Sequence, residues 1–199
     1  MLYSTVSSYD FLDVMSWDVA VAAFLLAIGS LTLQYNSKER RIDDQNTDLR
    51  IGFAIATGAS GFYLFVAGLA IDFLWPFAFS NGVYNVLFGG IAIMGGIILL
   101  AGSITLARNV DPRPVTYFAA IGGLYALVDA YGIMRYNLTS SPIIATLGYL
   151  GFAASAILSV PAAQFADKRW RYLFAVFAFL FTAVWLIQAA TFTLDHYKT

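Results

Sequence analysis

Five polar side chains in or beside long apolar stretches are the residues of this sequence best suited to chemistry. Asp129 is the deepest, because it lies about 14 residues into an apolar stretch that begins at Val115, or roughly 21 Å along a helix. A carboxyl group at that depth is costly in a bilayer and should face protein or water. It could bind a proton or a cation, or it could be a neutral, hydrogen-bonded group that holds helices together. The other four residues are Asp72, Tyr84, Asn85 and Gln188.

These five residues are expected in the same half of the membrane, and they predict an outward-facing polar pocket. The opposite half of the apolar stretches is almost purely apolar, so no polar path crosses the membrane and a proton channel is disfavoured. Tyr84 and Asn85 also have a structural interpretation, since turn and capping chemistry explains residues at the start of a helix. Asp72 can likewise be read as an interfacial residue at the end of a span.

The composition excludes several kinds of catalytic and metal site. With no cysteine, the chain has no disulfides, thiolate metal sites, iron–sulfur clusters or cysteine nucleophiles. Its single histidine, His196, cannot supply paired axial haem ligands or a multi-histidine metal centre. No histidine within an apolar stretch could activate a serine or threonine. We therefore expect no catalytic residues, metal or cofactor, which argues against an enzyme without excluding one.

The positions of these residues are set by six apolar stretches. The 199 residues are 60% hydrophobic and 12% charged, about half the charged share of a soluble domain. Each stretch reaches the ~20 residues that a helix needs to cross the hydrocarbon core. The sequence therefore predicts an all-α, polytopic membrane protein, a single domain over 1–199 that the lipid bilayer surrounds. Its spans are expected at about 14–35, 51–73, 83–107, 115–135, 142–166 and 171–194.

Charge in the connecting segments predicts the orientation. Nine of the 11 basic residues fall in the segments around 36–50, 108–114 and 167–170, which alternate with segments that are nearly free of them. Basic loops stay in the cytoplasm, so both termini should lie outside a cell membrane. The acceptor sequence at Asn137 lies on the predicted outer side, which agrees with this topology. The net charge of -1 gives no reason to expect a nucleic-acid partner.

Small residues predict how the helices pack. Pairs such as Ala92 and Gly96 recur four positions apart, and in lipid such spacing allows close approach of helix backbones. The third stretch is richest in glycine, so we expect it near the bundle centre. A second pattern is an echo of the segment at Gly61 in the segment at Gly123, 62 residues later. It suggests a duplicated two-helix unit, and the same offset would pair Gly89 with Gly151.

The turn between the second and third stretches carries a family resemblance. Trp75-Pro76, followed by Tyr84-Asn85 and Phe88-Gly89, resembles a family of archaeal and bacterial multi-pass membrane proteins, domain of unknown function 981. The resemblance implies a prokaryotic, most often archaeal, cytoplasmic membrane, and it implies no activity. In the structural interpretation of the turn, Trp75 anchors at the interface and Pro76 ends the second span.

Three function classes remain for such a chain. The first is a non-catalytic subunit or assembly component of a larger membrane complex, with other membrane subunits as partners. The alternative is a small transporter or channel with an outward-facing polar pocket around Asp129. The third is a membrane-embedded enzyme. Absence of clustered carboxylates, histidines and cysteines places the enzyme last, and absence of a polar path across the membrane places the transporter second.

Overall fold

Six long helices make up nearly all of the protein. The computed structural model describes residues 9–33, 35–36, 39, 41–42, 47–74, 83–139, 141–165 and 167–196. The helices are α1 Tyr9–Thr32, α2 Thr47–Leu74, α3 Ile91–Arg108, α4 Arg113–Tyr136, α5 Pro142–Gln164 and α6 Lys168–His196, with a π-helix, η3 Asn85–Gly90, leading directly into α3. All six, with η3 and α3 counted as one span, are long and apolar enough to cross a membrane, which confirms the predicted fold class.

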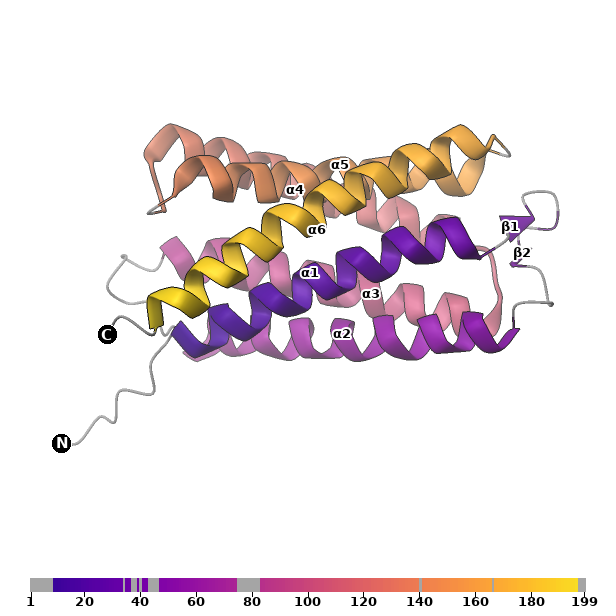
Figure 1. Ribbon diagram of the computed structural model, residues 1–199, viewed down its shortest axis with the longest axis horizontal. Helices are drawn as coiled ribbons and strands as arrows, with labels where there is room; N and C mark the ends of the chain where they lie inside the picture. Colours follow the sequence, from indigo (N-terminus) through magenta and orange to yellow (C-terminus); the bar gives the residue numbers. More distant parts are fainter. Residues whose placement is uncertain are drawn as a thin grey trace.

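The helices form three antiparallel pairs. As Figure 1 shows, α2 lies beside α3, α4 lies beside α5, and α1 and α6 run obliquely across one face of both pairs. The start of α1 and the end of α6 lie at the same end of the bundle, opposite the two short strands. That this end faces outward stays a prediction from the charges of the loops. The turn at 75–82 that carries Trp75 and Pro76 lies outside the described residues.

The long basic segment folds in part onto the helix bundle. Strands β1 Tyr35–Asn36 and β2 Arg41–Ile42 pair antiparallel, with Tyr35 opposite Ile42. The side chain of Asn109 clamps β2 from the end of α3: its Oδ1 accepts from the Ile42 N–H at 2.8 Å and its Nδ2 donates to the Ile42 carbonyl at 2.9 Å. Asn109 can do this because it caps α3 in the left-handed conformation, with φ 49°.

The charged sequence of 36–50 predicts a solvated turn, and the structure corrects this prediction at Arg50. It belongs to the first turn of α2 and is buried. Its guanidinium donates to the carbonyls of Leu106 and Ala107, the latter at 2.9 Å. These carbonyls belong to the last turn of α3, where helix geometry leaves backbone acceptors without intrahelical donors. A cation at a helix C-terminus also complements the helix dipole.

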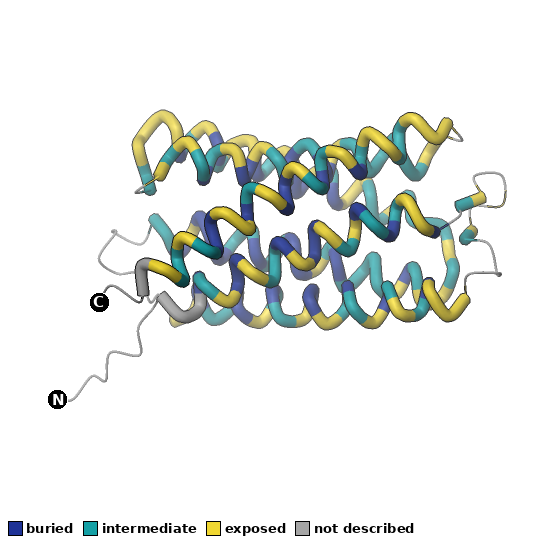
Figure 2. Tube along the Cα trace, viewed as in Figure 1, coloured by how far each residue is buried: buried dark blue, intermediate teal, exposed yellow. Residues whose placement is uncertain are grey.

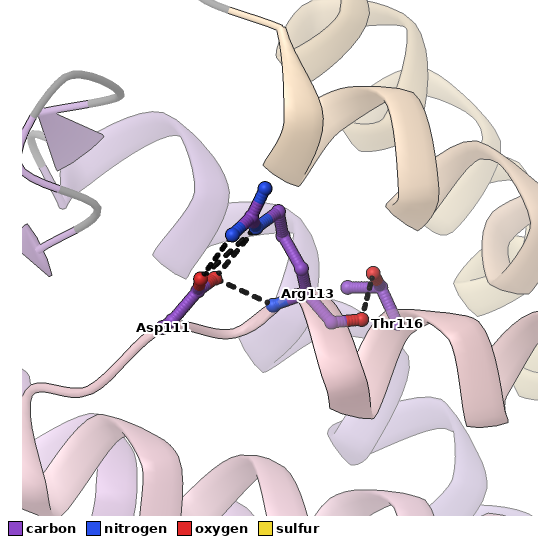
Figure 3. A network of polar contacts seen from close by, with 3 residues as sticks. All are labelled: Asp111, Arg113 and Thr116. Atoms are coloured by element: carbon purple, nitrogen blue, oxygen red, sulfur yellow. Dashed lines mark hydrogen bonds and ion pairs between the residues drawn. The ribbon is translucent and has the colours of Figure 1, made fainter.

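Because proline suits the first turn of a helix, the sequence predicts helix starts at two prolines, and both helices start there. Pro114 lies in the first turn of α4 and Pro142 opens α5, where a missing N–H costs nothing. The turn before α4 is held by Asp111, whose carboxylate accepts from the Arg113 side chain at 2.6 Å and from its backbone N–H at 3.1 Å (Figure 3). Thr116 donates to the Arg113 carbonyl, so polar groups of this turn are satisfied locally.

The core between the helices consists largely of small side chains. Buried positions follow the inward faces of the helices (Figure 2), and alanine is the commonest residue among them. Gly96 is in close contact as predicted: a Cβ there would lie 2.5 Å from the Phe65 backbone nitrogen and 2.8 Å from the Gly61 carbonyl. The structure does not single out α3 as the central helix. The most buried span is α2, and α3 is buried to the same extent as α1 and α6.

The two helix pairs share one packing arrangement. A Cβ on Gly61 of α2 would collide with α3 around Gly96, Leu99 and Leu100. A Cβ on Gly123 of α4 would be in tight contact with α5 at Ala153, Ala156 and Ile157. Each glycine therefore packs against the same triplet spacing on the returning helix. The first helices match at the predicted offset of 62 residues, from Gly61 to Gly123. The second helices match at 57, from Gly96 to Ala153, because fewer residues connect the paired helices in the second pair. Gly89 and Gly151 are therefore not equivalent.

Candidate functional site

The π-helix η3 makes room for two polar side chains from neighbouring helices. A Cβ on Gly89 would collide with the Asp72 carboxylate of α2, and a Cβ on Gly90 would lie 2.7 Å from the Tyr125 hydroxyl of α4. These glycines are thus needed for close approach of side chains, not for an unusual backbone angle. A π-helical turn within a longer helix is rare and often occurs at functional sites.

Tyr125 joins two of the predicted site residues. Its hydroxyl lies within range of electrostatic interaction with the carboxyl groups of both Asp129 and Asp72. Tyr125 and Asp129 are four residues apart on α4 and therefore share a helix face. The structure thus brings Asp72 and Asp129 to the same region from two different helices. The buried Oδ2 of Asp129 accepts no hydrogen bond from any residue that the structure describes.

Tyr149 of α5 completes the region from a third helix. Its side chain is buried, its hydroxyl donates to the Leu87 carbonyl of η3 at 2.6 Å, and it lies within electrostatic range of Asp129 and Tyr125. Sequence reasoning missed both tyrosines. The spacing of Tyr125 four residues before Asp129 was the signal that could have found the first. No local signal marks Tyr149, because only the packing of α5 against η3 positions it.

The other three predicted residues are placed differently. Asn85 begins η3 and is fully buried, and the Tyr84 ring packs edge-on against Phe88 with 5.8 Å between ring centres. The side chain of Tyr84 does not cap the helix. Gln188 is buried in α6, and no described interaction joins it to Asp129. The polar region is therefore centred on Asp72, Tyr125 and Asp129, and its binding of a ligand stays a prediction.

Polar contacts also tie α1 to its neighbours in the same half of the bundle. Ser60 of α2 donates to Asp18 Oδ1 at 2.8 Å. Thr193 of α6 donates to Asp13 at 2.6 Å and accepts from the Trp17 indole at 3.0 Å. These contacts join α1 to α2 and α6, and the second carboxylate oxygen of Asp18, Oδ2, is buried without a hydrogen-bond donor among the described residues.

An apolar cavity of about 340 Å³ lies between the helices and shares Tyr149 with the polar region. All six helices contribute to its lining, which includes Leu99 of α3, Phe152 of α5 and Arg171 at the start of α6. None of the five predicted site residues lines it. Within the described ranges, no three acidic or histidine side chains gather in a way that could hold a metal ion.

The fold and its polar region define a six-span helical membrane protein. The family comparison agrees with this class: residues 6–199 match the family described as Protein of unknown function (DUF981). The chain belongs to this family, and the resemblance seen at the turn after α2 is confirmed over nearly the whole sequence. No curated protein and no solved structure matches the chain.

Proposed function

We propose that this protein is a non-catalytic subunit or assembly component of a larger membrane complex, and that it contacts its partner through α4. The supporting observation is a mismatch on that helix. Of the six spans, α4 has the lowest mean hydropathy, yet together with α5 it is the least buried. A helix that faces only lipid has no reason to be less apolar than its neighbours, because lipid tails reward apolar surface.

Tyrosines and a carboxyl group interrupt the exposed face of α4, which is otherwise largely apolar. Its exposed residues include Tyr117, Val128 and Tyr131, and Asp129 lies half-buried beside them. Tyrosines near span ends are typical of the membrane interface. Tyr131 lies more than a turn inside the helix, where its hydroxyl gains from a polar group on an adjacent protein helix. The occupant that fits this face is therefore a transmembrane helix of another subunit with hydrogen-bonding side chains.

A bulky substitution on this face tests the proposal. The protein would be extracted in mild detergent from the membranes of its source cells and run on a native gel. Val128→Trp should release the chain from its complex, because the indole occupies the contact surface. Ile55→Trp on α2 is the matched control, since Ile55 and Val128 are both 68% exposed, and it should leave the complex intact. Equal migration of all three proteins would contradict the role of α4.

A second candidate function is a small transporter or channel that binds a cation or proton in an outward-facing pocket. The approach of Asp72 and Tyr125 to the glycines of η3, with Asp129 one helical turn beyond Tyr125 on α4, supports it. If Asp129 binds a cation, added Na⁺ or K⁺ should raise the melting temperature of the purified protein, and Asp129→Asn should abolish that rise. A parent protein whose melting temperature is indifferent to these ions and to mildly acidic pH would remove this candidate.

A further inference from the structure

The large cavity is apolar even where serines and threonines line it. Each lining serine or threonine donates its hydroxyl to a carbonyl of its own helix three or four residues earlier, so the hydroxyl is not offered to the cavity. The donor–acceptor pairs are Ser30–Ala27, Thr57–Phe53, Thr105–Ala101, Thr116–Arg113, Ser155–Gly151 and Ser159–Ala156. The interior surface therefore resembles hydrocarbon and has little to offer a polar solute.

Such a volume is suited to an apolar chain. A buried water molecule needs two to four polar partners, and this lining supplies few of them. An empty space would leave the lining atoms without the dispersion contacts that close packing provides. At about 340 Å³ the cavity is within the usual range of ligand pockets. In a membrane, the abundant molecules with a long apolar chain are lipids.

Arg171 gives one end of the cavity a positive charge. Its side chain lines the cavity near the start of α6, at the end of the bundle where the strands lie. Its Nη1 is 3.5 Å from the Leu33 carbonyl, which is the limit of a hydrogen bond. In the part of the chain that the structure describes, Arg171 forms no ion pair, and the one salt bridge there joins Arg113 to Asp111. Its guanidinium can therefore bind an anionic group that enters at this end.

Trp185 supplies a second hydrogen-bond donor to the cavity, further along α6 than Arg171. The side chain is only 6% exposed, and its Nε1 finds no hydrogen-bond acceptor among the described residues. Trp185 and Gly148 both line the cavity, and a Cβ on Gly148 would lie 3.2 Å from Nε1. Trp185 follows Arg171 by 14 residues, roughly 21 Å along the helix. This distance is longer than the hydrocarbon part of one leaflet, because the two leaflets together have a hydrocarbon core about 30 Å thick.

We propose that this cavity binds the apolar chain of a membrane amphiphile whose anionic head, a carboxylate or a phosphate, is bound by Arg171. The charge at one end and the hydrocarbon-like lining of the rest together define this ligand class. The proposal is independent of a subunit contact at α4, because the cavity lies between the helices and α4 contributes to it through inward residues such as Ala119.

Two glycines allow the cavity to be filled without disturbing helix contacts. Gly95 and Gly102 line it, and a Cβ built on either meets no atom within 4 Å. Gly95→Leu and Gly102→Leu should therefore place side chains in the cavity while the protein stays folded. Gly52 also has open space around its Cβ but does not line the cavity, so Gly52→Leu is the matched control.

Trp185 makes binding observable. Detergent-purified protein would be titrated with 16-bromohexadecanoate, whose bromine at the far end of the chain can reach Trp185 and quenches tryptophan fluorescence on contact, and with its uncharged methyl ester. The part of the quenching that is absent from Trp185→Phe measures binding of the probe in the cavity. We expect the carboxylate to bind, Arg171→Gln to weaken it by about tenfold or more without weakening the ester, and each cavity-filling variant to abolish quenching while Gly52→Leu does not.

Three results would overturn the proposal. One is the absence of quenching that depends on Trp185. Another is equal quenching in Gly95→Leu and Gly102→Leu, which would place the probe on the lipid-facing surface. The third is equal affinity for the carboxylate and the ester in both the parent protein and Arg171→Gln, which would show that Arg171 recognises no anionic head.

Discussion

Adjacent glycines in α3 have opposite surroundings. Gly96 faces α2 so closely that a Cβ would lie 2.5 Å from the Phe65 nitrogen, whereas Gly95 faces open space in the cavity. The contact at Gly96 follows from small residues spaced four apart, and the sequence predicts it. The cavity beside Gly95 cannot be predicted that way, because it depends on how all six helices diverge.

Substitution should separate these two glycines. Gly96→Leu should lower the free energy of unfolding by about 1–3 kcal/mol, because the added side chain overpacks the contact between α2 and α3. Gly95→Leu should cause no such loss. Thermal melting of the detergent-purified variants measures the difference, and an unchanged melting temperature for Gly96→Leu would contradict the close contact.

A second prediction concerns the contribution of Asp129 to stability. Its buried Oδ2 accepts no hydrogen bond from the described residues, so this oxygen does not join Asp129 to another helix. Asp129→Leu should therefore change the unfolding free energy by less than about 1 kcal/mol, or increase it, since an intramembrane carboxyl group is itself costly. Loss of about 1–3 kcal/mol on thermal unfolding would instead indicate a partner left unsatisfied.

At the scale of the helices, the sequence predicts local features but not contacts between distant segments. The sequence locates the six helices and the prolines that open α4 and α5, because apolar length and proline chemistry are local properties. It misassigns Arg50 to a solvated loop, since the acceptors of Arg50 belong to α3, more than fifty residues away. The π-helical turn at η3 and the position of Tyr149 also depend on long-range packing, and no local signal predicts them.

Arg50 should stabilise the bundle by holding α2 to the end of α3. Arg50→Gln removes a charged donor from two carbonyls in a buried setting and should destabilise the protein by about 1–3 kcal/mol. Arg41→Gln is the control, because Arg41 is exposed on β2. Melting curves of both variants decide the matter, and equal melting temperatures would show that the Arg50 contacts contribute nothing.

At the scale of the whole molecule, the charge of the loops predicts which end of the bundle faces the cytoplasm. The chain has no cysteine, so single cysteines report topology cleanly. An impermeant thiol reagent on intact cells should label Ser141→Cys, between α4 and α5, and spare Val110→Cys, between α3 and α4. Both residues are exposed and lie in turns at opposite ends of α4. Labelling of position 110 alone would reverse the orientation.

We also propose that this bundle is part of a larger membrane complex, because α4 is less apolar than a lipid-facing helix needs to be. The most direct test is the protein mass of the particle extracted in mild detergent, measured by native mass spectrometry. We predict a mass that contains the 21.7 kDa chain and at least one different polypeptide. A particle of one 21.7 kDa chain, or of whole multiples of it, would contradict a role as a subunit of a larger complex.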